Sequence, residues 1–266
     1  MRILDLGCGF AKTKDAIGVD RAPLVPVDVM TDLEELPYPF AASTFDKIVL
    51  NDVIEHLPNT IKAMEEIYRL CRPDARVFIR VINWSSHYNA MDPTHLRTFH
   101  EHTFNFFGTY KERSYYSSAR FDVVKVDKGY NERAKKLFRN NVRWMEWASH
   151  FLNNVLEDLH FELKAVKPAA PAIPGTEDSA DLFQILRCPH CVAGLTKKPG
   201  ADPGRLKRLN ENWLLCEEVG CGRKYPVYEG LPAFFRQVAE EYRSIALDAL
   251  PKSAAPSDFA RIPYPY

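Results

Sequence analysis

The chain has 266 residues, enough for one full α/β core and a smaller second unit, because single domains usually run to about 100–200 residues. Hydrophobic residues make up 46% and aromatic residues 12%, as in a globular protein, and the 35 basic and 35 acidic residues give no net attraction to nucleic acid or anionic lipid. No run of about 18 apolar residues occurs, and the chain opens on a strand-like segment. We therefore expect a cytoplasmic protein that does not engage a membrane.

Residues 1–130 alternate short β-branched runs with helical patterns. This alternation predicts an α/β fold with a mostly parallel sheet and helices on both of its faces. Within the helical pattern of residues 60–71, apolar side chains recur at helical spacing, so one face of that helix should pack on the sheet. The strand-like runs are RILDLG, IGVD, KIVLN, RVFIRVIN and FDVVKV.

Residues 132–159 predict one long helix, followed by a closing strand over residues 160–167. Trp144, Trp147, Phe151 and Val155 fall on one stripe of that helix, which favours core packing over stacking on a substrate. A Pro- and Ala-rich stretch then marks a linker. The sequence thus predicts a first domain over 1–167, a linker over 168–180, a second domain over 181–237, and a short helix with a loose tail over 238–266.

The segment LDLGCG carries two glycines after the first predicted strand. Gly7 and Gly9 allow a tight turn and a close approach of the backbone to a ligand. Asp20 ends the second predicted strand, where an acid can accept hydrogen bonds from both hydroxyls of a ribose. A further acid, Asp32, precedes the segment LPYPFAASTFD.

In this order the motifs over residues 3–83 resemble the class I S-adenosylmethionine-dependent methyltransferases of the type 11-like group. The resemblance implies a Rossmann-like sheet and a methyl-transfer activity. It also implies that Asp5 opens the cofactor motif, Gly7 and Gly9 cradle the methionine part, Asp20 holds the ribose, Asp32 meets the adenine amino group and Asn51 lies beside the sulfonium.

Two features depart from that family's pattern. Ala11 stands where a third glycine is common, and the ten residues between Gly9 and Asp20 are too few for a full crossover helix and a strand. We therefore expect a stub in place of the first helix. With no helix upstream of the first strand, the cofactor pocket should be open and covered in part by the long helix, the second domain or a partner subunit.

Candidate acceptor-side residues follow the fourth and fifth strands. Asp92 and His95 lie in a loop that should face the same crevice as His56, and His or a carboxylate is the usual base when a hydroxyl or a protonated amine is methylated. We therefore predict His95, Asp92 and His56 as catalytic residues. An equally good interpretation makes Asp92 a turn cap and Arg97 a tie that holds the loop shut. A metal site made of Glu55, His56 and His95 lacks a recognised ligand spacing.

Four of the six cysteines form two pairs near the end of the chain. A C-x2-C pair and a C-x4-C pair separated by 24 residues predict a closed, structural zinc site of four thiolates. The ligands would be Cys188, Cys191, Cys216 and Cys221, and so small a unit should need its metal to fold. The other two cysteines, Cys8 and Cys71, should be buried apolar residues.

The block KYPVYEGLPAFF after the last cysteine resembles the small zinc-ribbon activator subunit that partners tRNA, rRNA and translation-factor methyltransferases. The resemblance implies intramolecular docking of this ribbon on an apolar face of the first domain. Fusion would make such docking effective even with weak contacts.

The sequence leaves three functions to compare. The first is methyl transfer to an O or N atom of a small-molecule acceptor; the second is methylation of RNA or of a translation factor; the third is a non-catalytic adaptor. Neutral net charge speaks against RNA, although a basic loop within the predicted ribbon contains Lys197, Lys198, Arg205, Lys207 and Arg208. The oligomeric state stays open, a homo-oligomer included.

Overall fold

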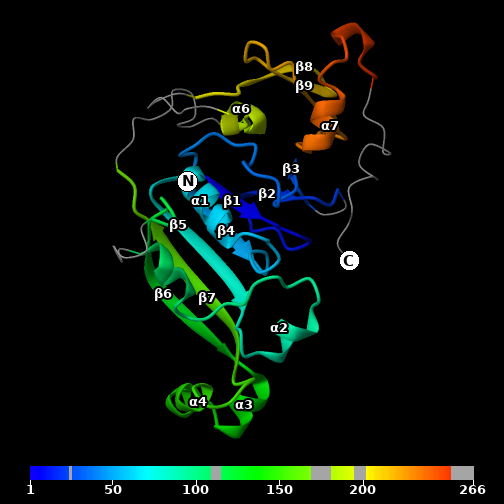
Figure 1. Ribbon diagram of the computed structural model, residues 1–266. Helices are drawn as coiled ribbons and strands as arrows, with labels where there is room; N and C mark the ends of the chain where they lie inside the picture. Colours follow the sequence, from blue (N-terminus) through cyan, green and yellow to red (C-terminus); the bar gives the residue numbers. More distant parts are fainter. Residues whose placement is uncertain (24–25, 109–114, 169–180, 195–201, 253–266) are drawn as a thin grey trace.

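The computed structural model describes residues 1–23, 26–108, 115–168, 181–194 and 202–252 (Figure 1). Its larger sheet consists of β1 (Ile3–Leu6), β2 (Ala16–Asp20), β3 (Val29–Met30), β4 (Phe45–Asn51), β5 (Cys71–Ile82), β6 (Phe121–Tyr130) and β7 (Leu156–Ala165). The strand order is β3-β2-β1-β4-β5-β7-β6, in which β7 runs antiparallel to β5 and β6 while the other pairs are parallel. The predicted α/β class with a mostly parallel sheet is confirmed.

The core lies between this sheet and helix α1 (Thr60–Leu70). The helix starts at Asn59, whose side chain accepts a hydrogen bond from the Lys62 amide at 3.0 Å. Its buried apolar positions recur every three or four residues, as predicted. Alternate residues of β1, β4 and β5 meet that stripe, and the buried members of the shared core include Leu4, Leu6, Ile48, Leu50, Met64, Ile67, Leu70, Val77 and Ile79.

The segment that joins β1 to β2 contains no helix over residues 7–15, all of which the structure describes. The chain turns back through a hydrogen bond from the Ala16 amide to the Thr13 carbonyl at 3.1 Å, and Asp15 adopts a φ of 61°. The connection is therefore even shorter than the helix stub that the sequence predicts. The connection from β1 to β2 is therefore a loop and not a crossover helix.

The long helix predicted over residues 132–159 is wrong. Two short helices stand in its place, α3 (Glu132–Leu137) and α4 (Val142–Ser149), because Arg139 and Asn140 take φ values of 50° and 58° that no helix accommodates, and Asn141 then caps α4. The final strand begins at Leu156 and includes the closing strand expected over 160–167. Figure 1 shows α3 and α4 at the end of the domain far from β3, so they do not cover the carboxyl ends of β1 and β2.

The predicted aromatic core stripe is also wrong for three of its four members. Trp144, Trp147 and Phe151 are 58%, 57% and 72% exposed, and only Val155 is buried. The periodicity is real, but the break at Arg139 and Asn140 turns α4 so that Met145 and Ala148 face the small local core instead. The aromatic side chains contact one another on the surface.

A second, smaller antiparallel sheet follows in the order β11-β10-β9-β8. Among the described residues no helix is long and apolar enough to cross a membrane. The linker predicted over 168–180 lies outside the described residues except for Pro168, as does the tail from residue 253. The remaining elements are α2 (His87–Met91), η1 (Thr103–Phe107), α5 (Leu182–Ile185), α6 (Pro189–Gly194), β8 (Leu206–Asn210), β9 (Trp213–Cys216), β10 (Lys224–Tyr228), β11 (Leu231–Pro232), α7 (Arg236–Glu241) and η3 (Leu247–Ala249).

The two sheets meet at the edge strand β3. Ala233 forms a parallel bridge with Met30, the Phe234 amide donates to the Met30 carbonyl at 2.8 Å, and the Thr31 hydroxyl donates to the Phe234 carbonyl at 3.1 Å. Residues after β11 thus pair with an edge that would otherwise be open. A shared apolar cluster at this junction contains Cys8, Val27, Met30, Trp213, Ala233, Phe235, Val238 and Tyr242.

A buried ion pair fixes a second contact between the two parts. Glu66 and Arg69 of α1 have side chains only 8% and 10% exposed. Arg69 donates to both Glu66 oxygens and to the carbonyls of Tyr38 and Phe40, while Glu66 accepts the Tyr38 amide at 2.7 Å. The segment that Arg69 holds then bonds to the second part of the chain. The Ala41 amide donates to the Ile185 carbonyl, and the Arg187 amide donates to the Pro39 carbonyl.

Replacing Arg69 by Ala should lower the free energy of unfolding by about 3–5 kcal/mol, because Glu66 would remain buried without its partner. Arg69→Lys keeps the charge but not the forked geometry and should fall in between. Urea denaturation followed by circular dichroism measures both. The exposed Arg133→Ala is the control and should stay within about 0.5 kcal/mol of the parent; a loss below about 1 kcal/mol for Arg69→Ala would contradict the role of the pair.

Candidate functional site

The turn after β1 has the geometry that its glycines predict. Gly7 and Gly9 have φ values of 66° and 49°, in the left-handed region that favours glycine. A Cβ on Gly7 would lie 2.5 Å from a methyl carbon of Val53, whereas a Cβ on Gly9 would meet nothing within 4 Å. Gly7 therefore allows the loops after β1 and β4 to touch, and Gly9 borders open space.

Two acids accept hydrogen bonds from the backbone of the connection between β1 and β2. Asp5 is buried, and its Oδ2 accepts the Thr13 amide at 2.6 Å, which holds the shortened connection in place. Asp20 accepts the amides of Gly9 at 3.1 Å and Ala22 at 3.0 Å, one on each carboxylate oxygen. Since a carboxylate oxygen has a second lone pair, Asp20 can still accept from a ligand hydroxyl.

Asp32 lies two residues after β3, the strand that pairs with β2. The Thr31 amide donates to the Asp20 carbonyl at 3.1 Å, so the ends of β2 and β3 are bonded together. Arg21 approaches Asp32 at 3.6 Å. Lys12 pairs with Asp28 at 2.9 Å. Gly7, Gly9, Asp20 and Asp32 therefore gather at one edge of the sheet.

The ends of β4 and β5 continue this edge. Asn51 is the exposed last residue of β4, and Asp52 follows with a φ of 54°. Arg80 of β5 forms ion pairs with Asp52 and, at 2.9 Å, with Asp158. The Leu96 and Arg97 amides donate to the Glu55 carbonyl at 2.9 and 3.1 Å, which ties the loop after β5 to the end of β4. Arg97 also donates to the Pro58 carbonyl, so it helps to close this loop.

A cleft of about 660 Å³ opens beside these loops. It lies at the carboxyl end of the parallel strands, where open α/β sheets bind their ligands. Its size falls in the range of small-molecule sites. The residues that line it are Asp52, His56, Arg80, Ile82, Tyr88, Met91, Asp92, Pro93, His95 and Glu157.

His56, Asp92 and His95 form a cluster in the cleft, as the sequence predicts. One nitrogen or oxygen of each lies within 4.8 Å of those of the other two, and the two imidazole rings meet edge to face with centroids 4.8 Å apart. The hydroxyl and amide of Thr94 hold the pKa of Asp92 below its ordinary value, which keeps that carboxylate ionised. Asp92 therefore caps its turn and faces His95 at the same time.

Glu55 lies behind this cluster and is 1% exposed. Burial raises its pKa to about 7. One carboxyl oxygen accepts the Ile82 amide at 3.4 Å, and the other finds no partner among the described residues. A buried acid with a perturbed pKa beside a cleft is a feature of functional sites.

The model of a protein family described as a methyltransferase domain matches residues 1–126. The match covers the glycine turn, Asp20, Asp32, the end of β4 and the loop of the cleft. These residues form a class I S-adenosylmethionine-dependent methyltransferase domain. The resemblance drawn from the sequence is confirmed.

Solved structures similar to the chain include methyltransferases. An S-adenosylmethionine-dependent methyltransferase from Archaeoglobus fulgidus is 21% identical, with a TM-score of 0.44, over 61% of this chain and 85% of that one. Phosphoethanolamine N-methyltransferase 2 from Haemonchus contortus is 16% identical, with a TM-score of 0.42, over 63% of this chain and 49% of that one. A chain of the Haloferax volcanii complex between the Trm112 methyltransferase activator and a methyltransferase is 15% identical, with a TM-score of 0.39, over 62% and 83%. A search of curated proteins found no match.

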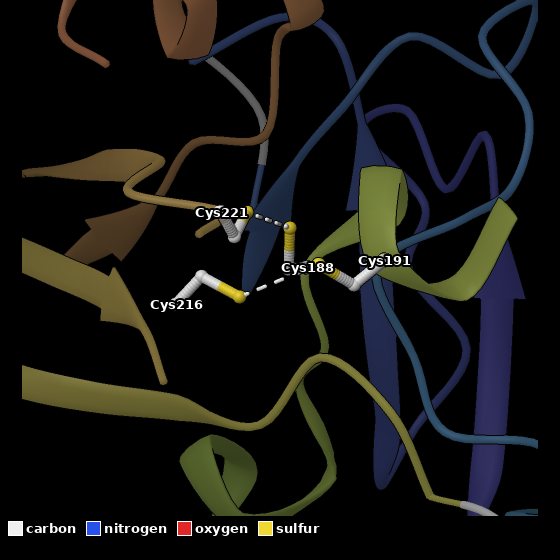
Figure 2. A group of neighbouring side chains, drawn as sticks. All are labelled: Cys188, Cys191, Cys216 and Cys221. Carbon is white, nitrogen blue, oxygen red and sulfur yellow. Dashed lines mark hydrogen bonds between the residues drawn. The ribbon is translucent and has the colours of Figure 1, made fainter. Parts of the chain in front are cut away.

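The four cysteines predicted as metal ligands converge beside the second sheet (Figure 2). Cys188 and Cys191 come from the start of α6, and Cys216 and Cys221 from the end of β9 and the loop before β10. The Sγ distances are 3.8 Å for Cys188 to Cys221 and 3.6 Å for Cys191 to Cys216. Four thiolates at about 2.3 Å from one tetrahedral ion would be about 3.8 Å apart. The sheet is zinc-ribbon-like, and the cluster fits such an ion.

Hydrogen-bond donors surround the cluster. The Tyr225 hydroxyl lies 3.0 Å from the Cys188 sulfur, and Arg223 lies 3.6 Å from the Cys221 sulfur. Four thiolates around a divalent ion carry a net charge of −2, which a nearby cation and hydroxyl offset. The remaining cysteines, Cys8 and Cys71, are buried, as expected.

The structure adds functional residues that the sequence did not single out. Thr94 orients both His56 and Asp92, Arg80 links Asp52 to Asp158, and Glu55 is a buried acid. The run DPTH offered a signal for Thr94, since Asp followed two residues later by a hydroxyl is typical of a turn. Of the predicted basic loop, Lys197 and Lys198 lie outside the described residues, and Arg205 pairs with Asp202 at 3.2 Å.

Proposed function

We propose that the chain transfers a methyl group from S-adenosylmethionine to an O or N atom of a small molecule held in the cleft at the carboxyl ends of β4 and β5. The observation that supports this proposal is the continuity of one sheet edge. The glycine turn and two acids occupy the ends of β1, β2 and β3, and a cleft with two histidines and a carboxylate follows at the ends of β4 and β5. Donor and acceptor would therefore meet across the end of β4, at Asn51.

The residues of the chain fit the cofactor. Gly9 borders open space in which the methionine part would fit, and Gly7 allows the turn to pack against Val53 beside it. Asp20 would accept from the ribose hydroxyls, and Asp32 would meet the adenine amino group. Asp5 supports the turn through the Thr13 amide. S-adenosylmethionine, when bound, supplies a methyl group on a sulfonium, and the electron pair of the broken S–C bond stays on sulfur.

The chain positions the acceptor and receives its proton. A lone pair of the acceptor atom forms the new bond to the methyl carbon, and an acceptor hydroxyl or ammonium must lose a proton for that lone pair to be available. His95 would take this proton, with Asp92 beside it to favour the charged imidazolium, and His56 would complete the wall of the site. Arg80 and Asp52 shape the opposite side of the cleft.

A small molecule is the acceptor that the cleft favours. Its volume suits a ligand of that size, and both signs of charge line it. An RNA acceptor would require a basic surface beside the site, yet the chain carries 35 basic and 35 acidic residues. Methylation of RNA or of a protein is therefore the alternative that the experiment must separate.

The cysteine cluster would hold a structural Zn²⁺. Four thiolates leave no position for a substrate, and the cluster lies beside a sheet too small to have a large core of its own. The ribbon would act within the chain as the related activator subunits act between chains. It pairs with β3 and shares an apolar cluster with Cys8, next to the glycine turn, and so it would support the cofactor side of the domain.

Asp20→Ala should weaken binding of S-adenosylhomocysteine roughly 100-fold. Two hydrogen bonds to a charged group are lost, each worth about 1.5 kcal/mol. Isothermal titration calorimetry measures the affinity, and Asp122→Ala, an exposed acid on β6, is the matched control with unchanged affinity. If the parent chain does not bind S-adenosylhomocysteine, the adaptor function holds and the enzyme proposal fails.

His95→Ala should cut methyl transfer about 100-fold or more without loss of cofactor affinity, because a positioned base contributes that much to proton transfer. The assay incubates the chain and methyl-labelled cofactor with cell extract, which is then divided by ribonuclease, protease and filtration. Label in the small-molecule filtrate is the expected result, and label sensitive to ribonuclease or protease contradicts the small-molecule acceptor. The exposed His102→Ala, from the same loop, should keep full turnover.

Metal removal tests the ribbon. Chelation, or Cys216→Ser, should abolish the bound zinc and unfold the second sheet, because folding of such small units is coupled to their metal. Element analysis gives the zinc count, and circular dichroism follows the unfolding. Cys71→Ala, outside the cluster, should keep one zinc per chain; one zinc per chain in Cys216→Ser would contradict the ligand set.

A further inference from the structure

We infer that His56, Asp92 and His95 form a binding site for a divalent transition-metal cation, open to the cleft and separate from the four-cysteine cluster. The three side chains come from two loops, one after β4 and one after α2, that the Glu55 carbonyl ties together. Two imidazoles and one carboxylate are a ligand set for divalent first-row transition metals that leaves coordination positions open.

Hydrogen bonds fix the tautomers of both histidines. The Thr94 hydroxyl donates to Asp92 Oδ1 at 2.6 Å, since an ionised carboxylate cannot donate. That hydroxyl must therefore accept from His56, whose Nδ1 lies 2.9 Å away and so carries a hydrogen. His95 Nδ1 lies 3.2 Å from the Asn89 carbonyl, which can only accept. In both neutral imidazoles the hydrogen is on Nδ1, and Nε2 offers a lone pair.

These contacts are the outer-shell pattern of metal ligands. A metal-bound histidine usually donates its other N–H to a carbonyl or a comparable acceptor, and a metal-bound carboxylate is itself hydrogen-bonded. Asp92 Oδ1 receives both the hydroxyl and the amide of Thr94, at 2.6 and 2.8 Å, which leaves Oδ2 to face His95. Thr94 thus orients two of the three ligands.

The spacing agrees with one shared ion better than with direct contacts. His95 Nε2 and Asp92 Oδ2 are 3.9 Å apart, too far for a hydrogen bond. Ligands at about 2.1 Å from one tetrahedral ion lie about 3.4 Å apart. One ligand atom of each of the three residues lies within 4.8 Å of those of the other two, so side-chain movements of about 1 Å would bring the ligands to this spacing. The His95 side chain is 7% exposed and that of Asp92 45%, so the open positions face the cleft.

The metal site would favour one class of methyl acceptor, and this inference rests on the proposed function. A cation held by three protein ligands can take two or three further donors, and an oxygen atom bound to it loses its proton more readily. An acceptor with two neighbouring oxygen donors, such as a hydroxyl beside a carboxylate or a second hydroxyl, would chelate the ion at the end of β4. The cation itself does not depend on this activity.

Cobalt is a suitable probe, because Co²⁺ is intermediate in the order of affinities of the divalent series and is paramagnetic. The full-length chain with its zinc in place is dialysed against Co²⁺, and both metals are counted by element analysis. One Co²⁺ per chain beside one Zn²⁺ is expected. Proton NMR should then show two strongly shifted, exchangeable imidazole N–H signals, one from each Nδ1–H opposite a ligating Nε2.

Variants decide the ligand set. His56→Ala and His95→Ala should each raise the dissociation constant for Co²⁺ at least about tenfold, and Thr94→Val, which removes the hydroxyl shared by His56 and Asp92, should do so about tenfold. Thr94→Val also provides the answer if a histidine variant fails to fold. His150→Ala, an exposed histidine next to α4, should leave the affinity unchanged.

The metal site is overturned if no Co²⁺ binds beyond the cysteine cluster. It is also overturned if His56→Ala, His95→Ala and Thr94→Val bind Co²⁺ as tightly as the control His150→Ala. Calorimetry with S-adenosylhomocysteine keeps the two proposals distinguishable. Unchanged cofactor affinity in Thr94→Val together with lost Co²⁺ supports the metal site, whatever the outcome of the methyl-transfer assay. Binding of Co²⁺ by a chain that does not bind S-adenosylhomocysteine would leave the metal site standing and remove the methyltransferase proposal.

Discussion

The pairing of the edge strand β3 with Ala233 and Phe234 is the constraint on which the glycine-turn side of the sheet depends. A two-residue edge strand has few hydrogen bonds of its own, and its outer side would otherwise be unpaired. Met30 and Thr31 bond to Phe234, and the shared apolar cluster extends to Cys8. Because Thr31 is also bonded to Asp20, the second sheet fixes the position of the two acids beside the glycine turn. This arrangement offsets the missing crossover helix after β1.

The topology also brings the glycine turn and the cleft to the same edge of the sheet. Parallel strands bring their carboxyl ends to one edge, so segments as distant in sequence as Gly9 and His95 share it without any contact of their own. The Glu55 carbonyl joins the loops of β4 and β5, and Gly7 allows the β1 loop to reach Val53 of the β4 loop. The edge is therefore one connected surface, and a shift in either loop would change both halves of the site.

The sequence predicted what local chemistry determines. LDLGCG, Asp20 and Asp32 mark turns and strand ends, and the cysteine spacing reflects the geometry of one ion, so both could be read without a structure. The prediction of one helix over 132–159 was wrong, because apolar periodicity carries no information on the positive φ angles of Arg139 and Asn140. The burial of Glu55 and the bond from Thr31 to Phe234, 203 residues apart, depend on tertiary packing that no local pattern contains. The bond between the Thr94 hydroxyl and His56, 38 residues apart, depends on packing in the same way.

The two ligand clusters differ in a way that keeps their roles apart. Four thiolates form a closed, soft site that favours zinc and excludes substrate, whereas two imidazoles and a carboxylate leave positions open toward the cleft. The Nε2 lone pairs that would bind a cation are the same lone pairs that would take a proton from the acceptor. With a cation bound, His95 cannot also act as the base, and the proton must pass to another group or to water. Under both proposals the number of donors on the acceptor would decide which chemistry the cleft performs, since a chelating acceptor would use the ion and a single amine or hydroxyl would need the free imidazole.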